Sequence, residues 1–253
     1  MTRLSLSPIS VLKFVLCIAL PFGAAQAASA AFLIPNSATP PFGDWSRGDA
    51  GSLYAEWDVF AVPFGTPGNA PDAGVFPDGG SPDANSALLV GNNPTGFLVG
   101  GNIYSFMAAT DFTVTFPGYG NGDGFNTRVA AQIRTRGTTV DLDSLQLAYN
   151  DGTSDILADW DFHTELHREH LGVDVGDQID HLFVFDILGH DPAALALNFA
   201  AAGSSMSLDR VAIDTFSTQS PLSLIPEPGT STLLLIGAAG LGFVHWRRRH
   251  VKS

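Results

Sequence analysis

The chain has 253 residues, and its 25 acidic residues against 12 Lys and Arg give a formal net charge of −13. All 25 acidic residues but only six basic ones, all Arg, lie within residues 31–228, so this stretch carries a net charge of −19. A domain of that charge is repelled by nucleic acid and by anionic lipid surfaces, so we expect no nucleic-acid partner and favour cations or neutral polymers.

Residues 1–30 have the layout of a secretory signal peptide. Two basic residues precede or flank the start of an apolar run over residues 14–22, and a cluster of small residues follows it. Cleavage after Ala27 and cleavage after Ala30 both satisfy the small-x-small rule, and an uncleaved anchor is the alternative. The single cysteine of the sequence, Cys17, lies within this segment, so we expect no disulfide bond in the mature protein.

Residues 31–216 are predicted to form one acidic all-β domain, an antiparallel two-sheet β-sandwich that is jelly-roll-like in its closing strand. Short runs of alternating or β-branched residues are separated by clusters of Gly, Pro, Asn and Asp, a pattern typical of short antiparallel strands. The predicted strands cover residues 51–62, 97–106 (as two strands about Gly100-Gly101), 111–116, 127–136, 140–149, 181–188 and 205–216.

Three of these segments allow finer predictions. Apolar and polar residues alternate over 127–136, which predicts a half-buried strand with its arginines on the solvent face. Residues 181–188 are apolar on both faces, so we expect a central strand there. The alternation over 205–216 changes phase, which predicts a β-bulge near Asp209-Arg210.

Two stretches are predicted to be connections. Residues 63–85 hold five Gly and five Pro in 23 positions, which indicates a long loop inserted within the single domain. Residues 217–228 are interpreted as a linker to the C-terminal tail.

A histidine cluster offers a candidate metal site. His163, His167 and His170 lie in "DFHTELHREH" with Glu165 and Glu169 between them. On a helix, His163 and His167 share a face and His170 follows one turn on, an arrangement compatible with zinc. On a strand, His163, Glu165 and His167 share a face and His170 lies on the other. The alternative is a solvated, acidic and histidine-rich edge.

A second candidate is the glycine-rich segment "GYGNGDGFN" at residues 118–126. Its side-chain oxygens, including those of Asn121 and Asp123, are ligands that Ca²⁺ accepts. The alternative is a simple Asn-Gly and Asp-Gly hairpin turn. We therefore expect no cofactor, with a structural Ca²⁺ ion kept as an alternative.

Carbohydrate binding needs exposed aromatic rings as stacking platforms. We take Trp45, Trp57 and Trp160 as the candidates, with Tyr104 and Tyr119 beside them. The alternative for each is a place in or near the core, where most Trp and Tyr of a sandwich lie. The sequence has no Gly-x-Ser-x-Gly, phosphate-loop or dinucleotide pattern.

The C-terminal tail carries a more specific pattern. In order, it contains Pro226, Glu227 and Pro228, an apolar run over 233–244, and Arg247, Arg248 and Arg249. Residues 229–253 are therefore predicted to form a transmembrane helix with a basic cytoplasmic end, a buried core helix being the alternative.

This order of features resembles the PEP-CTERM sorting signal of Gram-negative bacteria. The resemblance is confined to the tail and does not extend to the middle domain. It implies that an exosortase, a membrane protease-transpeptidase, recognises the tail and cuts near Pro226–Pro228. It also implies an inner-membrane intermediate that later reaches the cell surface or the extracellular matrix, in hosts that typically make exopolysaccharide.

Two functions fit the sequence. The first is a non-catalytic exported protein of the cell envelope or biofilm matrix, associated with exopolysaccharide. The second is a secreted glycan- or ester-hydrolysing enzyme that uses carboxylates or the His163–His170 cluster on the same scaffold. We favour the first, and convergence of His163, His167 and a carboxylate in one cleft would favour the second.

Overall fold

A computed structural model describes residues 32–34, 45–75, 86–173 and 175–223. The predicted signal peptide over residues 1–30 and the tail from residue 224 onward lie outside the described residues. Within the described ranges the regular elements are all β-strands, and the strand pairings are antiparallel. The prediction of an all-β antiparallel domain is confirmed, and the finer jelly-roll assignment stays a prediction.

Most described strands belong to two sheets. The larger sheet contains β1 (Ser52–Trp57), β2 (Ala73–Val75), β4 (Phe97–Val99), β5 (Asn102–Ser105), β8 (Asn126–Gly137), β11 (Phe162–Gly172), β12 (Gly176–Ile187) and β15 (Met206–Thr218). The smaller sheet contains β3 (Leu88–Gly91), β6 (Asp111–Pro117), β9 (Val140–Asn150), β10 (Asp155–Asp159) and β14 (Ala194–Ala201). A two-stranded ribbon joins β7 (Gly122–Asp123) to β13 (His190–Asp191).

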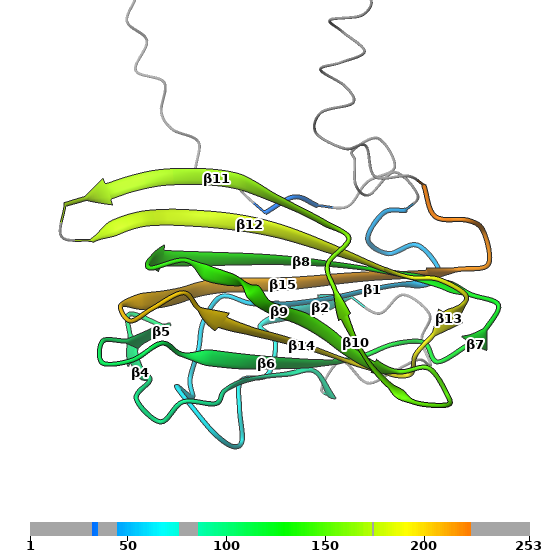
Figure 1. The fold of residues 1–253 in the computed structure, drawn as a ribbon, viewed down its shortest axis with the longest axis horizontal. Helices are drawn as coiled ribbons and strands as arrows, with labels where there is room; N and C mark the ends of the chain where they lie inside the picture. The colour runs from blue at the N-terminus through cyan, green and yellow to red at the C-terminus, as the bar shows by residue number, and fades with distance from the viewer. Residues whose placement is uncertain (1–31, 35–44, 76–85, 174, 224–253) are drawn as a thin grey trace, which may run out of the picture. The chain divides into compact units, whose positions relative to one another are not determined.

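The two sheets form two layers, as Figure 1 shows. The larger sheet runs in the order β11-β12-β8-β15-β1-β2, with β5 alongside β15 and β4 alongside β5. The smaller sheet runs β10-β9-β14-β6-β3. Strand β15, late in the chain, therefore lies between β8 and β1, so the segment next to the tail is held at the centre of a sheet.

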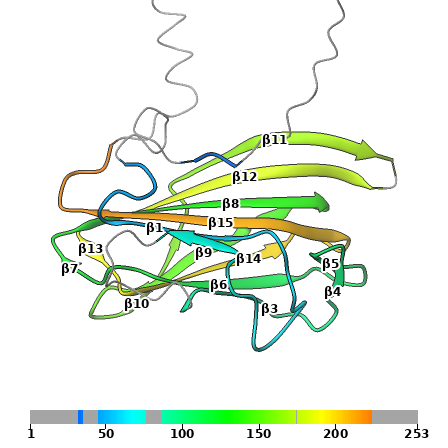
Figure 2. The same cartoon turned by 180° about the vertical axis from the view of Figure 1, so that it is seen from behind.

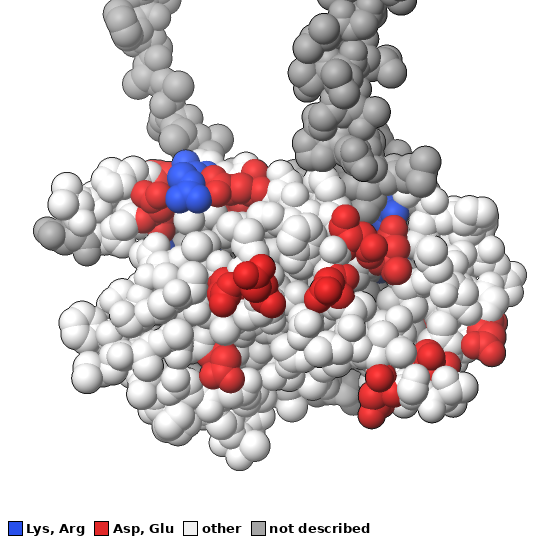
Figure 3. All heavy atoms as spheres, viewed as in Figure 1, with Lys and Arg blue, Asp and Glu red and all other residues white. Residues whose placement is uncertain are grey.

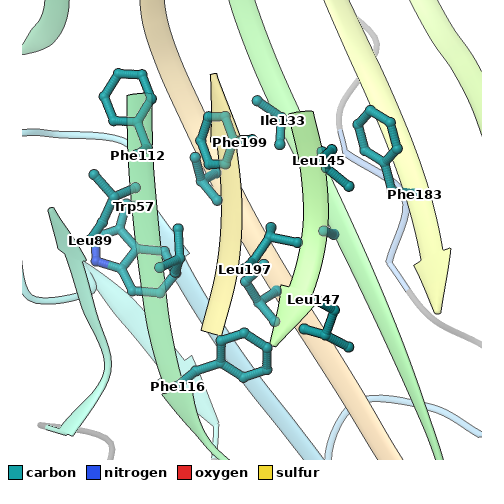
Figure 4. Packing of buried hydrophobic residues seen from close by; sticks show 14 of the residues in the cluster. Trp57, Leu89, Phe112, Phe116, Ile133, Leu145, Leu147, Phe183, Leu197 and Phe199 are labelled. Carbon is teal, nitrogen blue, oxygen red and sulfur yellow. The ribbon is translucent and has the colours of Figure 1, made fainter. Parts of the chain in front are cut away.

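The hydrophobic core fills the space between the layers, because alternate side chains of each sheet point inward. Figure 4 shows these side chains meeting across the gap. The smaller sheet contributes Leu89, Phe112, Phe116, Leu145, Leu147, Leu197 and Phe199, and the larger sheet contributes Trp57, Ile133 and Phe183. Burial of each such side chain contributes about 1.5–3 kcal/mol relative to leaving it exposed.

Strand β8 is buried on both faces over most of its length, which corrects the prediction of a half-buried strand. Arg134 donates from Nε and Nη2 to the two carboxylate oxygens of Asp180, each at 2.7 Å. Arg128 pairs with Asp186 in the same way, at 2.7 and 2.8 Å. These bidentate pairs neutralise the arginines, so the outer face of β8 tolerates burial.

Residues near the start of the described chain cover this outer face. Leu33 exchanges two backbone hydrogen bonds with the side-chain amide of Gln132, at 2.6 and 2.8 Å. Trp45 stacks on Phe216 with ring centroids 5.5 Å apart, and the Phe32 ring lies 4.5 Å below the guanidinium of Arg210. We expected the polar residues of β8 to face solvent. They are buried because the residues near the start of the described chain cover the outer face of the sheet.

Three local predictions are confirmed. Strand β12 is buried along residues 179–185 and has a neighbour on each side. Strands β4 and β5 are joined by Gly100-Gly101, whose φ values of +60° and +91° suit a tight two-residue hairpin turn. The register of β15 against β8 shifts between Leu208 and Arg210, which is the predicted bulge.

Several boundaries differ from the prediction, and β12 for example starts at Gly176 rather than at residue 181. The strand expected over 51–62 ends at Trp57, because the Asp58 and Val59 amides donate to Asp72 Oδ2, at 2.8 and 2.9 Å, instead of continuing the ladder. The loop expected over 63–85 contains β2, which pairs with β1; residues 76–85 lie outside the described residues. The linker expected from residue 217 starts later, because β15 continues to Thr218.

Candidate functional site

The structure separates the three clustered histidines along β11, so the strand alternative is the one observed. The pairing of β11 with β12 shifts register between Glu165 and His167. Glu165 therefore lies opposite His181 whereas His167 lies opposite Asp180, and adjacent strand residues point to opposite faces. The bulge thus corrects the expectation that His163, Glu165 and His167 share one face.

The convergence needed for a zinc site is absent from the described residues. His163 Nε2 lies 3.0 Å from His181 Nδ1, while His170 Nδ1 lies 2.9 Å from Asp177 Oδ1 at the exposed end of the hairpin. The part of the chain that the structure describes contains no group of three or more His, Cys, Asp or Glu side chains that could hold a metal ion. The metal-dependent form of the hydrolase alternative therefore lacks its expected ligand geometry.

His163, which is half-buried, and His181, which is buried, form a neutral pair. His181 Nε2 lies 2.7 Å from Thr139 Oγ1, and the His163 ring stacks on Phe183 with centroids 4.6 Å apart. Burial, followed by the nearby His163, lowers the pKa of His181 to about 4. Burial also lowers the pKa of His163. Both rings are therefore neutral near pH 7, and they connect β11, β12 and the turn before β9.

The far end of the β11–β12 hairpin carries an exposed ion-pair network. Arg168 donates to Glu165 at 2.6 and 2.9 Å and to Asp177 at 2.7 Å. Figure 3 shows this as a blue group flanked by red over β11 and β12. His170 and then Arg168 lower the pKa of Asp177. This network is the acidic and histidine-rich edge that the sequence offered as the alternative to a metal site.

The glycine-rich segment supplies β7, which pairs with β13 to form the two-stranded ribbon. Asn121 donates from its backbone N and from Nδ2 to Asp191 Oδ2, at 3.1 and 2.7 Å. Asp123 Oδ1 lies 3.0 Å from His190 Nδ1, and Asn126 Oδ1 accepts from the backbone of residue 189 at 2.9 Å. Asn121 and Asp123 thus engage separate partners on β13 rather than one shared ion. The hairpin alternative is also corrected, because the segment connects β6 and β8, which belong to different sheets, and its strand pairs with residues 190–191.

Two of the three tryptophan candidates for sugar stacking are buried. Trp45 is 1% exposed and Trp57 is 0% exposed, so neither ring offers a face to a ligand, which corrects that expectation. Trp57 Nε1 donates to the Asn69 carbonyl at 2.9 Å. Trp160 is half-buried and packs against the main core, with its Nε1 donating to the Leu142 carbonyl at 3.4 Å.

An open groove of about 850 Å³ lies at one end of the larger sheet. Figures 1 and 2 show the β4–β5 hairpin and the turn of the β11–β12 hairpin at that same end, and residues of both line the groove. Its lining includes Asn102, Tyr104, Phe106, Arg136, Ser207 and Asp209. Sequence reasoning named Tyr104 alone among these as a ligand-facing candidate. The aromatic residues around the Gly100-Gly101 turn are a sequence signal for Phe106, whereas Arg136, Ser207 and Asp209 reach the groove only through strand pairing.

The chain leaves the domain at a fixed point. Arg128 Nη2 donates to the Ser223 carbonyl at 2.8 Å, and Asn126 Nδ2 donates to the Ser220 carbonyl at 3.0 Å. Ser223 is the last described residue before the tail. Part of the predicted linker is therefore attached to the sandwich.

Residues 224–249 match the family model of the PEP-CTERM protein-sorting motif. This match confirms the resemblance predicted for the tail, and Pro226, Glu227, Pro228 and Arg247–Arg249 all lie within the matched range, outside the described residues. The chain has no match among the curated proteins. In the described ranges, no helix has the length and apolarity to cross a membrane. The motif indicates an exported protein that exosortase processes and that reaches the cell surface or the extracellular space.

Proposed function

We propose that this protein is a non-catalytic component of the cell surface or extracellular matrix that associates with exopolysaccharide after sorting through its C-terminal motif. The observation that carries the proposal is the motif match over residues 224–249, which begins directly after Ser223. A Gram-negative host and an inner-membrane intermediate, held by the tail before processing, are part of the same proposal.

The position of Ser223 supports processing that leaves the domain whole. The contacts of the sandwich include Ser220 and Ser223, whereas the Pro-Glu-Pro sequence starts at Pro226. A cut at or after Pro226 removes none of these contacts. The released domain therefore keeps its stability.

The charge of the domain supports a matrix role with neutral polymers. Residues 31–228 carry −19, and Figure 3 shows acidic groups spread over the visible face. A field of this sign keeps the protein soluble and discourages contact with anionic lipid and nucleic acid. It favours partners that bear no negative charge.

His163 and His167, the histidines proposed for hydrolysis, lie on opposite faces of β11, which supports the non-catalytic assignment. His163 is paired with His181, and His170 is paired with Asp177. The test is an assay of glycan and ester hydrolysis with the purified protein and with His163→Ala. We expect no turnover from either. Turnover by the wild type that His163→Ala abolishes would establish the enzyme instead.

Sorting is tested by replacing the three arginines of the tail with Gln in the native host. We expect the wild type outside the cell and the variant retained in the membrane fraction with its tail intact. A matched control is Arg168→Gln, which removes an exposed arginine of the domain. Identical distributions of all three proteins would contradict the proposal.

A further inference from the structure

Neighbouring strands of the larger sheet place one residue each in a row across its outer face. The paired residues are Phe97 of β4, Tyr104 of β5, Ser207 of β15, Arg136 of β8 and Gln178 of β12. Directly opposite residues of antiparallel strands point to the same face. Met206 and Leu208, on either side of Ser207, belong to the core. The row therefore faces outward, and its middle residues Tyr104, Ser207 and Arg136 line the groove.

Aromatic side chains form one wall of this groove. Tyr104 and Phe106 line it, and Phe97, beside the lining, packs edge to face against Tyr104 with ring centroids 5.3 Å apart. Phe97 is 43% exposed and Phe106 is 63% exposed, although an aromatic ring that large is ordinarily buried. Val99, Val173 and Val175 extend this apolar surface along the rim. Exposed apolar clusters with a polar border mark binding surfaces.

A hydrogen-bonded network of polar groups forms the other wall. Asn102 Nδ2 donates to Asp209 Oδ1 at 2.7 Å, and Arg136 Nη2 donates to Asp209 Oδ2 at 3.2 Å. Arg136 Nε also donates to Gln178 Oε1 at 3.1 Å, while its side chain remains 43% exposed. The bulge of β15 between Leu208 and Arg210 inserts Asp209 at this point. The network offers both donors and acceptors in fixed positions.

We propose that this groove binds a neutral glycan chain, with sugar rings against Tyr104 and Phe106 and sugar hydroxyls on the polar network. Sugar rings present an apolar C–H face and a rim of hydroxyls, so they match an aromatic wall beside paired donors and acceptors. The proposal rests on the function proposed above and names the ligand class and its site.

The charges favour a neutral glycan over an anionic one. The guanidinium of Arg136 is paired with Asp209, and Asp58 also lines the groove. An acidic polysaccharide would have to break the Arg136–Asp209 pair and approach a domain of charge −19. A second copy of this chain has the same net charge, so self-association is less favoured too.

The test uses the full-length protein in mild detergent and affinity electrophoresis in gels that contain a polysaccharide. The neutral probes are dextran, a β-1,3-glucan, a galactomannan and the neutral polysaccharide fraction of the native host, and polygalacturonate is the anionic probe. The variants are Tyr104→Ala and Phe106→Ala. The matched control is Phe64→Ala, because Phe64 is 42% exposed but does not line the groove.

We expect at least one neutral probe to retard the wild type and Phe64→Ala equally, and each groove variant to bind about tenfold more weakly. Circular dichroism identifies a variant that has not folded. If Tyr104→Ala is unfolded, the binding result of Phe106→Ala alone tests the proposal. Binding to no neutral probe, equal binding by all variants, or binding to polygalacturonate alone would overturn the proposal.

Sedimentation separates glycan binding from self-association. A dimer that Phe106→Ala converts to a monomer, without glycan binding, would overturn the glycan proposal in favour of a second copy. Export and tail processing do not depend on Phe106. A correctly exported protein with an inert groove therefore defeats this inference alone, whereas a protein that is not exported defeats the proposed function.

Discussion

Arg128 Nη2 donates a 2.8 Å hydrogen bond to the carbonyl oxygen of Ser223. The same guanidinium forms a bidentate pair with Asp186 of the neighbouring strand, and its side chain is 1% exposed. Ser223 is the last described residue before the sorting motif. A buried arginine of the larger sheet therefore fixes the point from which the tail departs.

Replacing Arg128 should loosen this attachment and weaken the fold. We expect Arg128→Met to lower the free energy of unfolding by about 2–4 kcal/mol, because it leaves Asp186 without its main partner. Urea denaturation measures the loss, and limited proteolysis should show faster cleavage near Ser220–Ser223. The matched control is Arg136→Met, whose half-exposed ion pair should contribute less than about 1 kcal/mol. Equal losses for the two variants would contradict this role of Arg128.

Removing one partner of the Arg134–Asp180 pair should lower the free energy of unfolding strongly, whereas replacing both partners with apolar residues should lower it little. Asp180 has a 1% exposed side chain, so Asp180→Asn leaves the charge of Arg134 poorly compensated and should lower the free energy of unfolding by about 3–5 kcal/mol. The double variant Arg134→Met/Asp180→Leu should recover most of that loss. Urea denaturation of the three proteins checks both values. A double variant as unstable as the single one would show that the pair contributes more than charge compensation.

His181 should make the domain less stable in mild acid. Its pKa is about 4 in the folded protein against 6.5 in the unfolded chain, so the unfolded chain binds more protons between these values. The free energy of unfolding therefore falls as the pH drops from about 6.5 to about 4, by on the order of 3 kcal/mol for this group. His181→Gln removes the effect.

The measurement is the difference between wild type and His181→Gln in urea stability at pH 7 and at pH 4.5. Groups common to both proteins cancel in this comparison. We expect the wild type to lose more stability than the variant on acidification. Equal losses of stability in the wild type and in His181→Gln would mean that protonation of His181 does not destabilise the folded protein.

Replacement of the buried Trp57 should destabilise the protein more than replacement of the half-buried Trp160. Trp57→Phe leaves a cavity and removes one of the two hydrogen bonds that the Asn69 carbonyl accepts, so we expect a loss of about 2–4 kcal/mol in the free energy of unfolding. Trp160→Phe, at a half-buried position with a 3.4 Å bond, should lose less than about 1.5 kcal/mol. Thermal denaturation of both variants distinguishes them, and a reversed order would contradict the burial of Trp57.

Features set by local sequence were predictable. The Gly100-Gly101 turn needs two positive φ values that glycine adopts without strain, and the phase change around Asp209 marks the bulge directly. The sorting tail is likewise a linear pattern, and its match over 224–249 agrees with the prediction.

Features set by distant residues were not predictable. The alternating pattern of residues 127–136 predicts that Arg134 faces solvent. The pattern does not reveal Asp180, which contacts Arg134 because β8 pairs with β12. The groove depends on the registers of several strands, which place Tyr104, Ser207 and Arg136 in one row. A single sequence carries no record of those registers, so Tyr104 was one aromatic candidate among several and Phe106 was not a candidate at all.

The most direct test of the account is the intact mass and location of the protein purified from its native host. We predict an extracellular or surface-bound protein whose mass corresponds to a chain that begins after the signal peptide and ends near Glu227. A protein with its full tail, found in the inner membrane, would contradict sorting through the motif and with it the proposed matrix function.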